Sequence, residues 1–277
     1  MSATRVLAAL LEARTGQQIS PARSWRIESA LKPVMRELDL SCLDALVARL
    51  ASPGEAACAT TVVEALLNNE TSFFRDAAVF EQIEQDVLAS LRESRATMRR
   101  LRLWSAGCST GQEPYSLAMM VLDDPARWLG WNIDIVGTDV SASAIAQAAA
   151  GRYTPFEIQR GLPVRTMLKW FVPEGEHWFA DPRLRRSVRF QAHSLFDPIS
   201  APADLILCRN VLMYFPEAHR RTVFERLADA LELGGMLVLG AGETVIGLTE
   251  RFVTHPSLRG VYTRTDDRES RRKVASG

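Results

Sequence analysis

The sequence predicts an α/β protein in which an all-helical N-terminal region precedes a parallel, doubly wound sheet. Residues 1 to about 95 carry apolar side chains at helical spacing. From about residue 100 onward, short apolar runs that suit buried strands alternate with helical segments, the pattern of a parallel sheet with right-handed crossovers. The length of 277 residues favours about two domains, which fits this change of pattern.

The N-terminal region is expected to begin with an amphipathic helix and to continue with a second helix over about 22–38. The apolar run VLAALL at 6–11 has helical spacing and is followed by Glu12, so we expect one face of an amphipathic helix here and not a signal peptide. Pro33 should kink or divide the second helix, because proline lacks the N–H that the helix needs.

Three polar residues are expected to start the next helices of this region. Ser41 can cap a third helix, and Thr61 with Glu64 forms a capping box ahead of an apolar stripe. Asp76 can cap a further helix that carries Val79, Phe80 and Ile83. We therefore expect the helical domain and its linker to cover 1–76, and the second domain to cover 77–277.

The second domain is expected to alternate strands and helices. The strands are predicted at 101–104, 132–140, 204–208 and 236–240. Pro114 suits the first turn of a helix. Ser141 caps a helix that Gly151 ends, and Pro216 opens one that Gly234 and Gly235 end.

Two segments depart from the alternation. Residues 152–190 are rich in Arg, Pro and aromatic side chains and are too long for a plain loop, so we expect a small inserted β-subdomain. Its end, VRF at 188–190, should return to the main sheet. The polar tail at 266–277 is expected to be disordered.

Composition narrows the function classes. Lys plus Arg and Asp plus Glu number 33 each, so no global field draws the protein to nucleic acid or to a membrane surface. No segment reaches the ~18 uncharged apolar residues of a membrane span. None of the four cysteines forms a C-x-x-C pair, which disfavours a zinc site and fits a reducing cytoplasm.

Candidate ligand-binding residues follow the predicted strands, because open parallel sheets bind ligands at the carboxyl ends of their strands. Gly107 and Gly111 in SAGCSTGQEP permit a tight turn and close backbone approach to a ligand. Asp139 suits either a ribose diol or the start of the following helix. Glu113 suits either the helix dipole or a ligand ammonium.

Two further stretches fall at the same edge. In CRNVLMYF, Arg209 and Asn210 directly follow a strand, and Tyr214 is either a core residue or a site residue. His193 in AHSLFD invites a general-base role, although a lone histidine is more often structural.

The stretch NNETSFFRD at 68–76 lies between two helical segments but has the composition of neither a linker nor a core element. It places five consecutive polar residues before two phenylalanines and an arginine. Taken together and in order, NETSFFRD, WSAGCSTGQEPYSLAM, GTDVSASAIAQA and DLILCRNVLMYF resemble the CheR family of chemotaxis receptor methyltransferases. The resemblance covers nearly the whole chain and implies a class I, Rossmann-like methyltransferase domain that uses S-adenosylmethionine.

The resemblance also implies roles for individual residues. Asn69, Thr71 and Arg75 would contact S-adenosylmethionine or the reacting groups, while Phe73 and Phe74 pack the linker down. Glu113 would hold the methionine part of the cofactor and Asp139 its ribose. The remaining implied cofactor contacts are Ser194, which stands where relatives often have Asn, and Leu195, Arg209 and Asn210; Tyr214 is the nearby aromatic hydroxyl.

The implied reaction is methyl transfer to a glutamate side chain of a chemotaxis receptor. A free glutamate has a pKa near 4.3, so it is already an anionic nucleophile at neutral pH and needs no general base. This argues against catalytic roles for His193 and Cys108. Arg75 and Tyr214 are the candidates for orienting the substrate carboxylate.

The implied partner is the cytoplasmic domain of a methyl-accepting chemotaxis receptor, and the protein is expected to be a cytoplasmic monomer without a metal. In the family a cationic N-terminal helix faces the receptor. Here Arg23, Arg26, Lys32 and Arg36 could play that part or form a solvated face. Relatives that grip a receptor C-terminal peptide use the β-subdomain for strand addition.

Three alternative functions differ in the sequence features that they would require. A NAD-dependent oxidoreductase would need the G-x-G-x-x-G fingerprint, which is missing. A nucleic-acid methyltransferase would show an N/D-P-P-Y-like loop where CRNV stands. A non-catalytic module that binds the cofactor and docks a regulator remains open.

Overall fold

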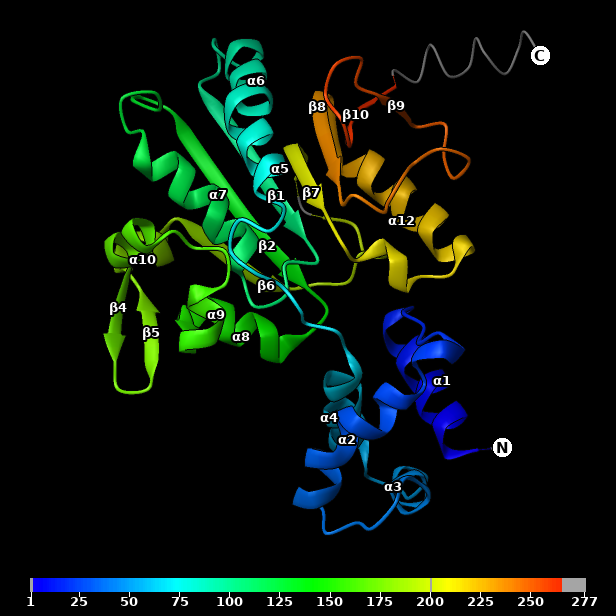
Figure 1. The fold of residues 1–277 in the computed structure, drawn as a ribbon. Coiled ribbons are helices and arrows are strands. Elements are labelled where there is room, and N and C mark those ends of the chain that lie inside the picture. The colour runs from blue at the N-terminus through cyan, green and yellow to red at the C-terminus, as the bar shows by residue number, and fades with distance from the viewer. Residues whose placement is uncertain (1, 200, 266–277) are drawn as a thin grey trace, which may run out of the picture. The chain divides into compact units, whose positions relative to one another are not determined.

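The computed structural model describes residues 2–199 and 201–265, which form two compact units (Figure 1). One unit comprises Met1–Asn68 and Met213–His219, and the other comprises Asn69–Leu212 and the chain from Arg220 onward. The linker stretch from Asn69 therefore groups with the sheet-containing unit. The tail predicted to be disordered lies outside the described residues.

The N-terminal unit is helical, as predicted. Its elements are α1 (Ala3–Thr15), the 3-10 turn η1 (Pro21–Arg23), α2 (Trp25–Glu37), α3 (Leu43–Leu50) and α4 (Ala56–Leu66). Each α-helix contributes fully buried aliphatic side chains to one core, among them Leu7, Ile27, Leu46 and Val62. The helical periodicity of the sequence thus marks the core-facing side of each helix.

Pro33 lies inside α2, which is not divided there and continues as one helix, while the alternative of a kink stays a prediction. Two other local predictions in this unit were wrong. Cys42, not Ser41, occupies the N-cap position of α3. Thr61 lies inside α4 and donates its hydroxyl to the carbonyl of Ala57, so it forms no capping box. The alanine-rich start of α4 at Ala56 explains the last error, since alanine has the highest helix propensity.

The second unit is built on a seven-stranded sheet in the order β6-β2-β1-β7-β8-β10-β9. Its strands are β1 (Arg100–Ala106), β2 (Asn132–Asp139), β6 (Val188–Ala192), β7 (Ala203–Cys208), β8 (Leu231–Leu239), β9 (Phe252–Thr254) and β10 (Val261–Arg264). The predicted parallel arrangement is confirmed for β6, β2, β1, β7 and β8. The antiparallel strands β10 and β9 were not predicted, because they are short and lack an intervening helix.

Helices precede the first strand of the sheet and connect later strands. They are α5 (Ala77–Gln82), a π-helical turn η2 (Ile83–Val87), α6 (Leu88–Ser94), α7 (Gln112–Asp123), α8 (Ala142–Ala150) and α12 (Glu217–Ala230). Ser141 caps α8 by accepting from the N–H of Ala144, and Gly151 ends it with φ 61°, as predicted. Gly234 and Gly235 do not end α12. They lie within β8, where the register against β7 is irregular, and glycine suits such an irregularity.

Residues 152–186 form the region inserted before β6. β3 (Arg152–Tyr153), β5 (His177–Ala180) and β4 (Phe171–Glu174) make a three-stranded antiparallel sheet, accompanied by α9 (Pro155–Gln159), α10 (Val164–Trp170) and α11 (Pro182–Arg186). The β4–β5 hairpin extends away from α10, which lies near its open end (Figure 1). The chain then returns to the main sheet, as predicted, and the structure shows that β6 pairs there with β2.

Candidate active site

The loop after β1 forms the floor of the candidate site. Gly107 and Gly111 have φ of 80° and 91°, which glycine adopts without strain. The backbone N–H groups of Gly107 and Cys108 donate to the carbonyl of Thr138 at 2.8 and 2.9 Å, which joins this loop to the end of β2. A Cβ added at Gly111 would lie 2.7 Å from the Cβ of Ala148, so the turn also needs glycine for packing.

Asp139 ends β2 at the same edge of the sheet. Its Oδ2 accepts from the backbone N–H of Ser109 at 2.8 Å, and its Oδ1 accepts from the N–H of Ser141 at 2.9 Å. The carboxylate is therefore held between the loop after β1 and the start of α8. Its backbone carbonyl accepts from the N–H of His193, which brings the chain after β6 to the same place.

Glu113 lies in the first turn of α7 and is paired inside the protein. Its Oε1 accepts from the hydroxyl of Ser105 at 2.7 Å, and its Oε2 accepts from Nη1 of Arg209 at 2.9 Å. The side chain of Arg209 is 1% exposed and that of Glu113 is 12% exposed. The sequence did not predict this buried ion pair.

Arg209 also holds the linker. Its Nη2 donates to the carbonyl of Arg75 at 2.7 Å and to Oδ2 of Asp76 at 2.9 Å, and its guanidinium lies over the ring of Phe80 at 5.4 Å from the centroid. Asp76 precedes α5, as predicted, but its side chain does not cap that helix. We call Arg209 with Glu113, Asp76 and the carbonyl of Arg75 the Arg209 clamp.

The rest of the linker is fastened by packing and backbone contacts. Phe73 is fully buried and packs edge-on against the rings of Tyr153 and Phe171, with centroids 5.0 and 5.2 Å away. The hydroxyl of Ser109 donates to the carbonyl of Asn69 at 2.8 Å. The predicted packing role of Phe73 is thus confirmed.

Two predicted linker residues are less enclosed. Arg75 is half-buried, and its Nη1 donates to the carbonyl of Glu70 at 3.1 Å. Thr71 is half-buried. Their contacts with a cofactor or a substrate stay predictions.

The loop after β7 carries Asn210 in a left-handed conformation with φ 60°. Asparagine tolerates this region better than most residues do. Glu243 fixes the loop, because its carboxylate accepts from the N–H groups of Asn210, Leu212 and Gly240 at 2.8, 2.8 and 2.9 Å. Within the described chain, the buried Oδ1 of Asn210 has no hydrogen-bond partner. A buried acceptor left in this state suits a ligand contact.

Sequence reasoning missed Glu243. It follows β8 at the edge where the other candidates gather, so the strand-end rule that selected Asp139 could have selected it too. In the chain after β6, Leu195 is buried, and the hydroxyl of Ser194 accepts from the N–H of Phe196 at 3.2 Å. Their predicted cofactor contacts are not tested by these interactions.

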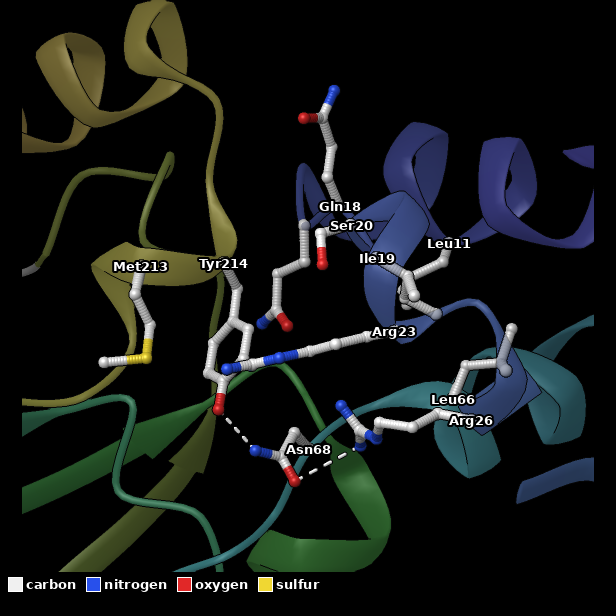
Figure 2. A pocket seen from close by; sticks show the side chains of 11 residues that line it. Leu11, Gln18, Ile19, Ser20, Arg23, Arg26, Leu66, Asn68, Met213 and Tyr214 are labelled. Atoms are coloured by element: carbon white, nitrogen blue, oxygen red, sulfur yellow. Dashed lines mark hydrogen bonds between the residues drawn. The ribbon is translucent and has the colours of Figure 1, made fainter. Parts of the chain in front are cut away.

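Tyr214 belongs to the N-terminal unit, whereas the other predicted site residues belong to the sheet-containing unit. Asn68 donates through Nδ2 to the hydroxyl of Tyr214 and accepts through Oδ1 from Arg26 at 3.3 Å (Figure 2). The backbone N–H of Gln18 donates to the carbonyl of Tyr214 at 2.7 Å. The sequence assigned Asn68 no role of its own.

A comparison with models of protein families identifies the enzyme family to which the chain belongs. A model of the CheR methyltransferase S-adenosylmethionine-binding domain matches residues 69–261. The chain belongs to the CheR family. The stretch of the match begins at Asn69, where the sheet-containing unit begins.

Individual relatives agree with this family. The chain is 34% identical over 248 residues to chemotaxis protein methyltransferase 1 of Pseudomonas aeruginosa, which covers 87% of this chain and 90% of the relative. It is 32% identical over 247 residues to the chemotaxis protein methyltransferase of Vibrio parahaemolyticus, covering 87% and 89%. Among solved structures, PKMT2 of Rickettsia typhi with S-adenosylhomocysteine aligns with 14% identity and a TM-score of 0.37, covering 61% of this chain and 26% of that one.

As a CheR methyltransferase, the protein uses S-adenosylmethionine as its methyl donor, and the residues present fit that molecule. The donor carries a cationic sulfonium and an ammonium, which two carboxylates at one sheet edge, Asp139 and Glu113, suit electrostatically. The unpartnered Oδ1 of Asn210 can accept from an N–H or O–H of a ligand. The direct contacts implied for Asn69, Thr71, Glu113, Asp139 and the other site residues remain predictions.

In the described part of the chain, no three His, Cys, Asp or Glu side chains gather as they would around a metal ion. Burial, then the charges of Asp139 and Glu113, raises the pKa of the Cys108 thiol well above its ordinary value. A neutral thiol is a poor nucleophile, so Cys108 is unsuited to covalent catalysis. Among the described helices, none has the length and apolar character to cross a membrane.

Proposed function

We propose that this methyltransferase transfers a methyl group to glutamate side chains in the cytoplasmic domain of methyl-accepting chemotaxis receptors, forming glutamyl methyl esters in the cytoplasm. The observation that carries the proposal is the match to chemotaxis protein methyltransferases along 87% of the chain. The CheR-type linker, with its arginine and its buried phenylalanine, supports the assignment.

The proposed methyl transfer needs no general base. When bound, S-adenosylmethionine supplies an electrophilic methyl group. A glutamate with a pKa near 4.3 is already anionic at neutral pH, so the protein needs to position it rather than deprotonate it. Positioning of two reactants can supply up to ~7–11 kcal/mol.

The proposed tasks fall to charged and polar side chains. Asp139 holds the ribose, and Glu113 lies where it can attract the cationic end of the donor. Arg75 and Tyr214 orient the carboxylate of the substrate, because a guanidinium and a phenol both donate hydrogen bonds to an anion. Arg209, with its guanidinium engaged in the clamp, acts through Glu113 and the linker.

Methyl transfer with isotopically labelled donor tests the proposal. The purified protein is incubated with a receptor cytoplasmic domain, and the product is treated with base. Release of volatile labelled methanol identifies a carboxyl methyl ester. Label that is stable to base would mean a different acceptor atom and would overturn the proposal.

Calorimetry on the same protein separates loss of transfer from loss of binding. We expect S-adenosylhomocysteine to bind and NAD not to bind. If S-adenosylhomocysteine binds but no receptor is labelled, the protein acts as a docking module that reads the cofactor, and glutamate methylation is wrong.

A further inference from the structure

A pocket in the N-terminal unit combines hydrogen-bond donors with no acid. It has a volume of about 240 Å³ and is lined in part by Arg23, Arg26, Asn68 and Tyr214 (Figure 2). None of its lining residues is Asp or Glu. Within the described chain, neither Arg23 nor Arg26 has a carboxylate within ion-pair distance. The pocket is therefore suited to an anion.

Asn68 has one orientation that satisfies both of its neighbours. A guanidinium only donates hydrogen bonds, so the side of the amide that faces Arg26 must be Oδ1. Its Nδ2 then faces the hydroxyl of Tyr214. The reversed amide would set N–H groups against the guanidinium, which is unfavourable.

This orientation determines the role of Tyr214. Nδ2 of Asn68 has hydrogens and no lone pair to offer, so the phenol oxygen must accept from it. The hydrogen of the phenol cannot be used in that contact and remains available for another acceptor. A free tyrosine hydroxyl can either donate or accept. Asn68 thus leaves the hydroxyl hydrogen of Tyr214 free to be donated to an acceptor other than Asn68.

We propose that Asn68 is a positioning residue that commits Tyr214 to donate its hydroxyl hydrogen to the carboxylate of the substrate glutamate. This inference rests on the proposed function, in which Tyr214 orients that carboxylate. Arg26 takes part by fixing the amide orientation. The acid-free lining lets an anionic side chain approach without repulsion from the pocket.

The substitution Asn68→Asp tests the polarity of the contact with almost no change in shape. It replaces the donating Nδ2 by an accepting oxygen, so the phenol donates to the introduced carboxylate instead of to the substrate. We expect kcat/KM for the receptor to fall about 10- to 100-fold, the usual effect of losing a hydrogen bond to a charged group. The affinity for S-adenosylhomocysteine should not change, which also shows that the variant is folded.

Gln17→Glu is the matched control for charge. Gln17 lines the same pocket, and within the described chain no hydrogen bond joins it to Tyr214, so this variant adds one negative charge there without changing the Asn68–Tyr214 contact. If repulsion of an acidic substrate explained the loss, Gln17→Glu would reproduce it. We expect Gln17→Glu to lower kcat/KM clearly less than Asn68→Asp does, because it adds the charge without redirecting the phenol.

A double-mutant cycle with Tyr214→Phe tests whether Asn68 acts through the phenol. In the Tyr214→Phe background, Asn68→Asp should add little further loss, because the hydroxyl that it redirects is gone. Equal losses in both backgrounds, or wild-type activity of Asn68→Asp, would overturn the proposal.

The intensity ratio of the tyrosine Raman doublet reports whether a phenol donates or accepts, and it needs no methyl transfer. Subtraction of the Tyr214→Phe spectrum isolates Tyr214 from the other three tyrosines. We expect an acceptor-type doublet in the wild type and a donor-type doublet in Asn68→Asp; an unchanged doublet would contradict the assigned polarity. If the wild type transfers no methyl group, the proposed function fails, while this comparison still decides the Asn68–Tyr214 contact.

Discussion

Replacing Arg209 by methionine should destabilise the sheet-containing unit strongly. Methionine keeps much of the side-chain volume but removes the charge and all the hydrogen bonds of the Arg209 clamp. Glu113 then stays 12% exposed beside an apolar group, with the hydroxyl of Ser105 still donating to its carboxylate. An uncompensated buried carboxylate is the main cost of such a change.

The two halves of the clamp differ in their expected contributions. The Glu113 half is buried, and breaking a buried pair by removing one partner costs about 3–5 kcal/mol. The side chain of Asp76 is 45% exposed, so its pair with Arg209 adds less than about 1 kcal/mol. We therefore expect a total near 3–5 kcal/mol and a fall in melting temperature of roughly 6–20 °C.

Urea unfolding followed by tryptophan fluorescence measures this effect. Every tryptophan except Trp25 lies in the sheet-containing unit, so the signal reports mainly on that unit. Arg189→Met is the control, because Arg189 is 63% exposed in its pair with Asp134 and should cost less than about 1 kcal/mol. A loss below about 1 kcal/mol in Arg209→Met would refute the reasoning. So would a failure of Glu113→Gln to restore part of the stability of Arg209→Met.

Three further outcomes are expected. Asp139→Ala should weaken S-adenosylhomocysteine binding at least about 100-fold by calorimetry, since it removes a charged acceptor for two ribose hydroxyls; unchanged affinity would remove Asp139 from the site. Gly161→Ala should lower the melting temperature far more than Gly175→Ala: both have positive φ, but a Cβ at Gly161 would lie 1.9 Å from a linker carbonyl and one at Gly175 meets nothing within 4 Å. A thiol reagent should label exposed Cys42 rapidly and Cys108 only on unfolding. Because burial raises the pKa of Cys108, folding favours its neutral form, and this contribution is lost as pH rises above 9.0, its ordinary value; rapid native labelling of Cys108 would contradict this.

The features that the sequence predicted well depend on nearby residues. Gly107 and Gly111 form the expected turn, and Ser141 caps its helix, because the cause of each lies within a few positions. The capping box at Thr61 failed although it too is local, because the helix propensity of the preceding alanines outweighed it.

The features that the sequence did not predict depend on distant residues. Arg209 meets Glu113 across 96 positions, and Asn68 meets Tyr214 across 146. All four residues lie in sequence stretches that are predicted to contribute to the site, but neither helical periodicity nor a capping rule relates residues so far apart in the chain. Only the folded chain shows that Arg209 binds the linker and that Asn68 donates to the hydroxyl of Tyr214.

The helical unit is discontinuous in sequence, which restricts how the protein can be divided. Met213–His219 packs with the first 68 residues, so the chain passes from one unit to the other three times. Removal of the first 68 residues would take away two hydrogen-bond partners of residues 213–219. The carbonyl of Tyr214 would lose the N–H of Gln18, and the ring of His219 would lose the carbonyl of Gly16. A truncated protein beginning at Asn69 would thus keep the sheet-containing unit, but residues 213–219 would lose the hydrogen bonds that hold them.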